Sequence, residues 1–389
     1  MAALDDVIVE IPCSFKHCSF KNGSVTSDHN RVEVKTYMPV DPSGNANLQV
    51  NWSPTGDGVF HNECWNALFD SESGLSDLEN DMVREASKTA EYHNSLSAVK
   101  NDAKRIVDML QKSKFAIAFT GAGISTSAGI GDFRGKSGKW TEDDRSKSYG
   151  ASAKADKKTH FCYEDLRPTY THEALAKLVE LGFIKHVISQ NCDGLHSLSG
   201  IPMDQLWELH GNVFHERCDR CGTRREWPHC INAGMVGWAL KKRCQSCRCY
   251  HYTGRKCPEL NCNGDMMDTV INFGDRLEQH VLDGALKNAK KNDLVLCLGT
   301  TLMVTPANTL IEAGKRPIRL VICNRQPTPY DKLCQRRGSD GEQYGCRVFG
   351  DCDDLMHEIM LHLLGPASLK AWENGREERL AYYSTRREH

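Results

Sequence analysis

The residues best suited to chemistry are cysteines that occur as closely spaced pairs. Cys218-x2-Cys221 is followed by two further pairs, Cys244-x2-Cys247 and Cys257-x4-Cys262. Two such pairs supply the four thiolates of a closed, tetrahedral structural zinc site. Either later pair could complete the set with the first, and the spacing slightly favours the earlier of the two. A second zinc could use a different set, namely Cys230, Cys244, Cys247 and Cys249.

A second group of candidate metal ligands lies near the N-terminus. Cys13-x4-Cys18 is followed, after a long loop, by His61-x2-Cys64 and then Trp65. Two such pairs of nitrogen and sulfur ligands can hold zinc, which would stabilise a segment with few core residues. The pattern is similar to the Cys/Cys/His/Cys fingers of the poly(ADP-ribose) polymerase type. His17 or His29 could replace a ligand, and the alternative is that these cysteines are free thiols.

A glycine turn between an apolar run and a helix forms a candidate phosphate site. Phe115 to Phe119 predicts a buried parallel strand, Gly121-Ala122-Gly123 a sharp turn, and Ile124 to Ile130 the first turns of a helix. Free N–H groups at that helix start would suit a pyrophosphate. Gly129 comes too late for the usual dinucleotide fingerprint, and no strand ending in an acidic residue follows. The charged segment Asp132-Phe133-Arg134 nevertheless favours a binding loop over an ordinary turn.

Strands and helices that alternate along the chain must position these groups. A helix predicted from Thr171 to Leu181 precedes a strand from Ile184 to Ile188, which ends in Ser189-Gln-Asn-Cys-Asp-Gly-Leu-His196. The alternation predicts a Rossmann-like α/β fold, with a parallel sheet, helices on both faces and ligands at the carboxyl ends of the strands. Further strands are predicted at 269–273, 294–298 and 319–323, and further helices at 277–290 and 353–364.

The regions outside this pattern differ in character. The N-terminal extension is polar and turn-rich, and it contains the candidate zinc finger. Ser76 to Glu79 is a capping box, and it begins a helical pattern that breaks near Tyr92. The expected parts are an N-terminal extension at 1–70, a helical connector at 71–104, a main domain at 105–365 with a zinc module inserted at 216–268, and a charged tail at 366–389.

Composition limits the class of protein. The chain has 389 residues, of which 40% are hydrophobic and 26% charged, and its net charge is −2. These values predict a soluble globular protein of two or three domains, in which nucleic-acid binding would need a local basic patch. We expect no secretory signal at Met1 to Asp6 and no membrane span, since no run of 18 apolar residues occurs. Eighteen cysteines then indicate a reducing compartment and metal binding.

Together, the motifs resemble those of the sirtuins, the NAD-dependent protein deacylases, over residues 105–365. Two segments, Gly121 to Gly135 and Gln190 to His196, match the cofactor loop and the segment for nicotinamide and ribose. Glu208-Leu-His-Gly211 carries the family's general base, and Gly299 to Leu302 and Asn324 to Gln326 match the later cofactor loops. The departures are Gly131 in place of the family's proline, Thr301 in place of a serine and Arg325 in place of a leucine.

Other residues resemble the nuclear branch that includes sirtuins 6 and 7. Gly138 to Thr141, Thr253 to Cys257 and Asp268 to Asp275 are typical of that branch, while Cys192 and Gly350-Asp-Cys-Asp-Asp354 look closer to sirtuin 7. The branch places its second zinc pair between the Thr-Gly-Arg stretch and the following strand. The resemblance therefore favours one zinc held by Cys218, Cys221, Cys257 and Cys262, with Cys244 and Cys247 as the alternative pair.

The resemblance also implies roles for single residues. His210 would be the general base, Asn191 would orient the ribose or a water, and Asp193 would hold the nicotinamide amide. Cys192 is expected to pack and not to react. An acyl-lysine peptide would add as a strand beside Phe273, Gly274 and Asp275 and beside the loop from Leu302 to Val304. The residues implied to contact NAD are Gly121, Ala122, Gly123, Ser125, Asp132, Phe133, Arg134, Trp140, Gln190, Asn191, Asp193, His210, Gly299, Thr300, Thr301, Asn324, Arg325, Gln326 and Cys352.

The implied reaction is the NAD-dependent removal of an acetyl or longer acyl group from lysine, with release of nicotinamide and O-acyl-ADP-ribose. Two alternatives are a protein mono-ADP-ribosyltransferase and a chromatin scaffold that senses NAD or ADP-ribose. The implied partners are acylated proteins such as histones, and the implied location is the nucleus, with the cytoplasm as the alternative. The N-terminal finger adds the hypothesis of contact with DNA or chromatin.

Overall fold

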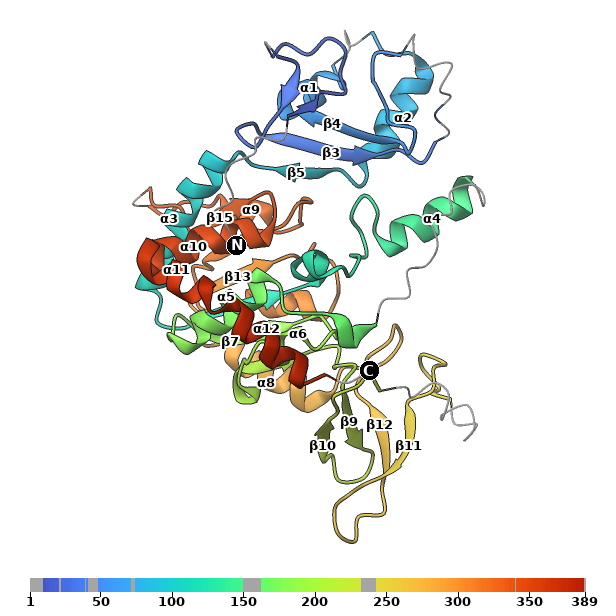
Figure 1. Cartoon of the computed structure of the whole chain (residues 1–389), viewed down its shortest axis with the longest axis vertical. Coiled ribbons are helices and arrows are strands. Elements are labelled where there is room, and N and C mark those ends of the chain that lie inside the picture. The colour runs from blue at the N-terminus through green and yellow to red at the C-terminus, as the bar shows by residue number, and fades with distance from the viewer. Residues whose placement is uncertain are drawn as a thin grey trace.

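The computed structural model describes residues 10–387 except 21, 39, 41–47, 71–73, 150–161, 232–242 and 340. Figure 1 shows three parts along the long axis of the molecule: an N-terminal module, a large α/β domain and a small cysteine-rich sheet module. Within these described ranges, no helix combines the length and the apolar character needed to cross a membrane.

A six-stranded sheet forms the centre of the large domain. Its strands are β6 Ala116–Thr120, β7 Ile184–Ser189, β8 Leu206–Glu208, β13 Leu294–Leu298, β14 Leu320–Cys323 and β15 Cys346–Val348. The spatial order is β15-β14-β13-β6-β7-β8, and every neighbouring pair is parallel. The chain passes from β6 to β7 and β8 on one side and then returns to β13 on the other. Such a reversal opens a crevice at the carboxyl ends of β6 and β13, where α/β sheets bind ligands.

Helices cover both faces of this sheet. Ala116 and Ala118 lie in one core with α3 Leu96–Lys112, α5 Tyr170–Glu180 and α10 Cys352–Leu364. Ile117 and Phe119 lie in the opposite core with α8 Gln279–Ala289. Successive side chains of a strand point to opposite faces, so an all-apolar strand such as β6 needs cover on both. The predicted Rossmann-like fold with helices on both faces is confirmed.

The N-terminal module is built on a three-stranded antiparallel sheet in the order β4-β3-β5. Val32 and Val34 on β3 are fully buried, and they pack in one core with Phe60, Trp65 and Met82. The helix that carries Met82 begins at the predicted capping box of Ser76 and Glu79, whose reciprocal hydrogen bonds are both present. The elements are β1 Ile11–Pro12, β2 Ser24–Val25, β3 Arg31–Lys35, β4 Asp57–His61, α1 Asn62–Ala67, α2 Asp77–Ser87 and β5 Glu91–His93.

The segment 71–104, expected as a helical connector, is shared between two parts of the molecule. Helix α2 packs in the core of the N-terminal module, and β5 pairs with β3 of the same module. Helix α3 instead packs against the large sheet. The break expected near Tyr92 is the strand β5, which lies between the two helices.

The cysteine-rich module is a four-stranded antiparallel sheet in the order β10-β9-β12-β11. Its strands are β9 His215–Cys218, β10 Arg224–Glu226, β11 Tyr252–Lys256 and β12 Asp265–Asp268. The prediction of a strand at 269–273 is wrong, because β12 ends at Asp268. After β12 the chain crosses back to the large domain. The backbone of residues 269–273 forms single hydrogen bonds there, such as the one from the Ile271 N–H to the His210 carbonyl at 3.0 Å, and is not part of a strand ladder.

Two other parts of the large domain refine the predicted elements. The predicted helix from Ile124 to Ile130 is a 3₁₀ helix, Ala122–Ala128, which ends at Gly129 with φ 93°. The charged tail forms two helices, and Arg379 there donates to Glu173 on α5 at 3.0 Å. The remaining α-helices are α4 Lys139–Tyr149, α6 Leu195–Leu198, α9 Asp331–Cys334, α11 Pro366–Asn374 and α12 Arg376–Thr385.

Candidate functional site

The loop after β6 packs directly against the loop after β13. The Gly123 N–H donates to the Gly299 carbonyl at 2.8 Å. A Cβ atom on Gly123 would lie 2.7 Å from Gly299 Cα, and one on Gly121 would lie 2.7 Å from Thr300 Cβ. Because these distances are shorter than the van der Waals contact distance between two carbon atoms, no side chain fits between the loops. The glycines of the predicted cofactor loop are therefore required by loop packing as well as by any ligand.

A pocket opens where the loops after β6, β13, β14 and β15 meet. Seven predicted cofactor residues line it: Gly123, Asp132, Gly299, Asn324, Arg325, Gln326 and Cys352. Four residues that were not predicted also line it: Glu91, Thr126, Gly350 and Asp351. The pocket lies at the carboxyl ends of the parallel strands, in the place where this kind of sheet holds nucleotides.

The segment after β7 connects both glycine loops. Asn191 Nδ2 donates to the Gly121 carbonyl at 3.1 Å, and Ser125 Oγ donates to Asp193 Oδ2 at 2.7 Å. Gln190 Nε2 donates to Thr300 Oγ1 at 2.9 Å. The structure thus brings together residues that the sequence places in three distant motifs.

His210, which follows β8, is oriented by the backbone of the same segment. Its Nδ1 lies 2.6 Å from the Gln190 carbonyl oxygen. Because a carbonyl oxygen only accepts, Nδ1 carries the proton and Nε2 keeps a free lone pair. Burial lowers the pKa of His210 below its usual value, against the opposing effect of the hydrogen bond to Gln190. The imidazole is therefore neutral at pH 7 and able to accept a proton.

Burial also sets the protonation of the neighbouring side chains. It raises the pKa of Asp193, although the hydrogen bonds from the Leu195 N–H and Ser125 lower it in part. Burial raises the pKa of Cys192 to about 12, with a further contribution from Asp193. A thiol with that pKa is not a nucleophile at neutral pH, which supports the prediction that Cys192 packs.

An aromatic cluster links the first cofactor loop to the predicted peptide segment. The Phe133 and Trp140 rings lie 4.9 Å apart, and the Trp140 and Phe273 rings lie 5.2 Å apart. The Arg134 guanidinium lies 4.3 Å from the Trp140 ring centre. Phe273 is 75% exposed, so it is available to a ligand. At Gly131, which precedes this cluster, a Cβ atom would meet nothing within 4 Å, and nothing in the structure explains the departure from proline.

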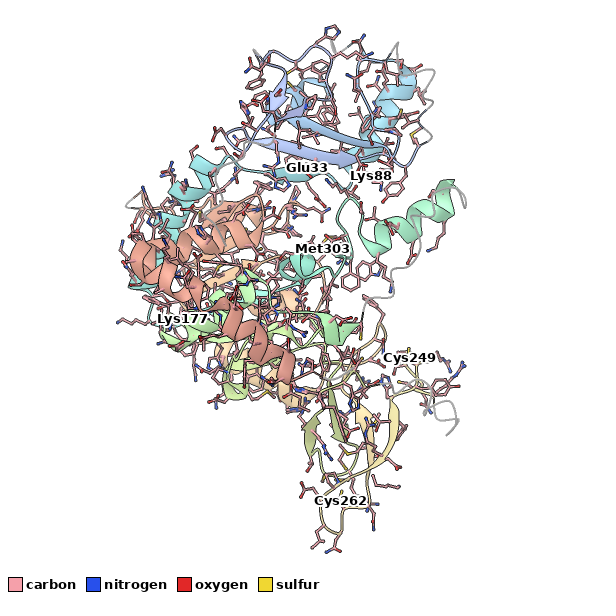
Figure 2. The ribbon with its side chains drawn as sticks, viewed as in Figure 1. Glu33, Lys88, Lys177, Cys249, Cys262 and Met303 are labelled. Carbon is pink, nitrogen blue, oxygen red and sulfur yellow. The ribbon has the colours of Figure 1, made fainter. Side chains whose placement is uncertain are left out.

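The other predicted residues lie in the same loops. Ala122 begins the 3₁₀ helix, and Gly274 follows Phe273 with φ +97°. Thr301 and Val304 flank Leu302, which is buried with a left-handed φ of 56°. Met303, labelled at the centre of Figure 2, is 58% exposed. Phe273 and Met303 thus expose apolar surface on two separate loops.

Four cysteines of the sheet module form one group that could hold a metal ion: Cys218, Cys221, Cys257 and Cys262. The Sγ atoms of Cys218 and Cys262 lie 3.5 Å apart, as do those of Cys221 and Cys257. Figure 2 shows Cys262 at the far tip of the module. Among the described residues, Cys257 and Cys262, the pair implied by the resemblance, lie with Cys218 and Cys221. Cys244 and Cys247, the pair favoured by spacing, do not.

The N-terminal ligands also meet in one group, which consists of Cys13, Cys18, His61 and Cys64. His61 Nδ1 lies 3.4 Å from Cys18 Sγ and 3.8 Å from Cys64 Sγ. Its other nitrogen, Nε2, donates to the Ser24 carbonyl at 3.0 Å, and this turns Nδ1 toward the sulfurs. The alternative ligands have other partners, because His17 contacts Gln49 and His29 contacts Thr26.

Known proteins are similar to the part of the chain that carries both glycine loops and His210. The model of the Sir2 family matches residues 121–306. The protein named NAD-dependent protein deacetylase Sirt6 of Drosophila melanogaster is 36% identical over 261 residues, which cover 67% of this chain and 76% of that protein. The chain belongs to the Sir2 family.

Two further relatives carry similar names. The Arabidopsis thaliana protein named NAD-dependent protein deacetylase SRT1 is 40% identical over 244 residues, which cover 62% of this Sir2-family chain and 47% of the relative. Human sirtuin-7, also named an NAD-dependent protein deacetylase, is 33% identical over 273 residues, which cover 68% of this chain and 60% of the human protein. The match thus spans about half the length of the Arabidopsis relative.

The N-terminal module lies outside the Sir2 family match but reaches the pocket. Glu91 comes from β5, which precedes the matched residues 121–306. Its carboxylate accepts a hydrogen bond from the Lys136 N–H at 2.9 Å, in the loop that follows Arg134. Sequence reasoning missed this residue because a three-residue polar strand has no local signal. Only its pairing with β3, about 60 residues earlier, places it.

Proposed function

We propose that the chain is an NAD-dependent protein-lysine deacylase, which removes an acetyl or longer acyl group and releases nicotinamide and O-acyl-ADP-ribose. One observation carries the proposal: the hydrogen bond between His210 and the Gln190 carbonyl. It leaves a neutral imidazole beside the segment that joins both glycine loops. The names of the Arabidopsis, Drosophila and human relatives support the same class of reaction.

The place of the pocket at the carboxyl ends of the strands supports a dinucleotide as its ligand. Four loops from neighbouring parallel strands converge on it, and two of them are in contact through glycines. Bound NAD would supply an electrophilic ribose carbon with nicotinamide as the leaving group. Arg325, on the loop after β14, would contribute positive charge near the diphosphate, although it is also paired with Asp351.

Each of the described side chains would have a separate role in the reaction. Nε2 of His210 would accept a proton from a ribose hydroxyl, since its partner nitrogen is held by the Gln190 carbonyl. Asn191, fixed on the Gly121 carbonyl, would orient the ribose or a water. Asp193 would bind the nicotinamide amide from its buried position beside Ser125. The rings of Phe133, Trp140 and Phe273 would exclude water from the acyl-lysine.

A panel of acyl-lysine peptides tests this proposal through NAD-dependent release of nicotinamide. We expect release with acetyl or longer acyl chains and none with the unmodified peptide. If no acyl peptide in the panel supports release, the deacylase proposal fails. Transfer of label from the adenylate part of NAD to protein, surviving His210→Tyr, would show the ADP-ribosyltransferase instead. Binding of NAD with neither reaction would favour the sensing scaffold.

We also infer that zinc occupies both ligand groups. Four thiolates, or three thiolates and one imidazole, form a closed shell that suits a structural Zn²⁺. Cys64→Ser is expected to lower the metal content of the purified chain by one atom. Cys162→Ser is the matched control, because that thiol contacts the Glu164 carboxylate and belongs to neither ligand group. An unchanged metal content in Cys64→Ser would contradict the N-terminal zinc.

Location and partners are proposed on the same grounds. A nuclear location is supported by the names of the sirtuin-6 and sirtuin-7 relatives. Acylated histones are the proposed substrates, and the N-terminal module is the proposed contact with DNA or chromatin. Chromatin fractionation of the full chain and of Cys64→Ser tests this role. Equal retention of both proteins on chromatin would argue against a role of the finger.

A further inference from the structure

We propose a third metal site, formed by Cys244, Cys247, His251 and Asp275, which binds a divalent cation of borderline softness such as Zn²⁺. One ligand atom from each of these four side chains lies within 4.8 Å of all the others. Two sulfurs, one imidazole nitrogen and one carboxylate oxygen form a complete tetrahedral set. This donor set suits zinc better than magnesium or calcium, which prefer oxygen ligands.

The closest distances between the four side chains are near the edge lengths of a tetrahedron, although each contact of Asp275 uses a different carboxylate oxygen. Cys244 Sγ lies 3.2 Å from Asp275 Oδ1, and Cys247 Sγ lies 3.2 Å from His251 Nε2. His251 Nε2 lies 3.4 Å from Asp275 Oδ2. With metal–ligand bonds of about 2.1–2.3 Å, the edges of a tetrahedron are about 3.4–3.8 Å. A central ion therefore needs only small side-chain adjustments.

A second carboxylate orients the histidine. His251 Nδ1 lies 2.8 Å from Asp268 Oδ1, on the side of the ring opposite to the cluster. Since a carboxylate accepts, Nδ1 donates to Asp268, and Nε2 is the ring nitrogen that faces Cys247 and Asp275. Carboxylate–histidine pairs of this kind fix the imidazole of metal sites. The cluster thus has an oriented ligand as well as suitable donors.

The backbone around Cys244 and Cys247 has the form of a metal-binding knuckle. The Arg248 N–H donates to the Cys244 carbonyl at 3.2 Å, and Arg248 has a left-handed φ of 65°. The Cys249 N–H donates to Cys247 Sγ at 3.3 Å. The first knuckle of the module shows the same kind of contact, from the Arg220 N–H to Cys218 Sγ at 3.3 Å.

This site is separate from the group of four cysteines. Figure 2 shows Cys249, next to the knuckle, well away from Cys262 at the tip of the module. Cys249 is exposed and is not a member of the new group, and neither is Cys230. The set proposed from spacing alone, with four cysteines, is therefore replaced by two cysteines, one histidine and one aspartate.

The site would fasten the predicted peptide segment to the knuckle. Asp275 follows Phe273 and Gly274 directly, and a Cβ atom on Gly274 would lie 3.1 Å from the Ser246 carbonyl oxygen. Metal binding would thus fix the position of the exposed Phe273 side chain. This consequence rests on the proposed deacylase function, whereas the metal site itself does not.

Metal analysis of the purified full chain by mass spectrometry tests the site. We expect three zinc atoms in the wild type, one fewer in Cys247→Ser, and no change in the control Cys249→Ser. Because a cysteine variant could fail to fold, His251→Gln is a second test, and it is expected to lose one atom while its circular dichroism is unchanged. A loss of one atom relative to the wild type supports the site whatever the total. Wild-type metal content in folded Cys247→Ser or His251→Gln would overturn it.

A kinetic readout separates this site from the proposed function. In His251→Gln we expect the KM for an acyl peptide to rise at least threefold, with the KM for NAD unchanged. If the chain proves to have no deacylase activity, the metal count still decides the site. If the metal count falls but the peptide KM does not change, the site is present and its coupling to the peptide segment is wrong.

Discussion

The Glu91 carboxylate of the N-terminal module lies 3.4 Å from the Arg325 guanidinium, and both residues line the pocket between the glycine loops. The backbone supports this contact, because the Tyr92 N–H donates to the Arg325 carbonyl at 2.8 Å. Arg325 is one of the departures from the sirtuin pattern, and Glu91 comes from the part of the chain outside the family match. The two differences meet at one point, where a residue of the N-terminal module lines the pocket.

Removing the charge of Glu91 is expected to weaken NAD binding. In Glu91→Gln, Arg325 loses an acidic partner, and the loop at Lys136 loses a charged hydrogen-bond acceptor. The KM for NAD should rise about three- to tenfold, with little change in kcat. Glu377→Gln, at an exposed position of α12, is the matched control. Equal KM values for both variants would show that the module does not contribute to the pocket.

Acidification is expected to destabilise the N-terminal module through His93. Burial, together with Arg31, lowers the pKa of His93 from 6.5 to about 4, although Glu33 and Asp351 oppose the shift. The unfolded chain therefore binds a proton below pH 6.5 that the folded chain does not bind until pH 4. Stability should fall over this window by at most about 3 kcal/mol.

Thermal unfolding of the wild type and of His93→Gln between pH 7 and pH 4 measures this effect. The variant lacks the buried imidazole at position 93, so its melting temperature should depend less on pH. His357→Gln, at a side chain that is 44% exposed, should retain the wild-type pH dependence. Parallel curves for the wild type and His93→Gln would rule out His93 as the source.

Two glycines of one loop are expected to differ sharply in their tolerance of a methyl group. Gly123→Ala places a Cβ atom 2.7 Å from Gly299 Cα, so the two glycine loops must separate. We expect a loss of about 1–3 kcal/mol of stability and a large rise in the KM for NAD. Gly131→Ala meets no atom within 4 Å and should be neutral. Similar unfolding curves and KM values for the two variants would refute the close packing of the loops as the cause.

The pH dependence of catalysis should reflect the environment of His210. Its pKa is lowered by burial, so the imidazole remains an unprotonated base further into the acid range than a free histidine. On this basis kcat/KM should still exceed half of its maximum at pH 6.5. An acid limb with its midpoint above pH 6.5 would mean that another group, or a differently placed histidine, controls the rate.

Local patterns were sufficient for much of the fold. The apolar run at β6 and the capping box at Ser76 each depend on neighbouring residues, and both were predicted correctly. The prediction of a strand at 269–273 was wrong because the backbone of this segment bonds to single groups, such as the His210 carbonyl, and not to a neighbouring strand. The first glycine loop also packs against a distant segment, namely the loop at Gly299, which its local sequence does not reveal.

The candidate site likewise contains residues that local motifs predict and residues that only tertiary contacts bring together. Residues carried by motifs, such as Asn191, Asp193 and His210, were predicted, and the structure brings them together. Glu91 was not predicted, and neither was the joining of Cys244 and Cys247 with His251 and Asp275, because tertiary contacts create both arrangements. His251 and Asp275 are 24 positions apart in the sequence, and nothing in their spacing marks them as ligands.

The most direct test of the central claim compares His210→Tyr with His280→Tyr, the same substitution at a side chain that is 63% exposed. Both proteins should bind NAD, and mass spectrometry would follow O-acyl-ADP-ribose after addition of an acyl peptide. We expect that the wild type and His280→Tyr form this product and that His210→Tyr forms at least about a hundredfold less. Product formation at the wild-type rate in His210→Tyr would contradict the assignment of His210 as the base.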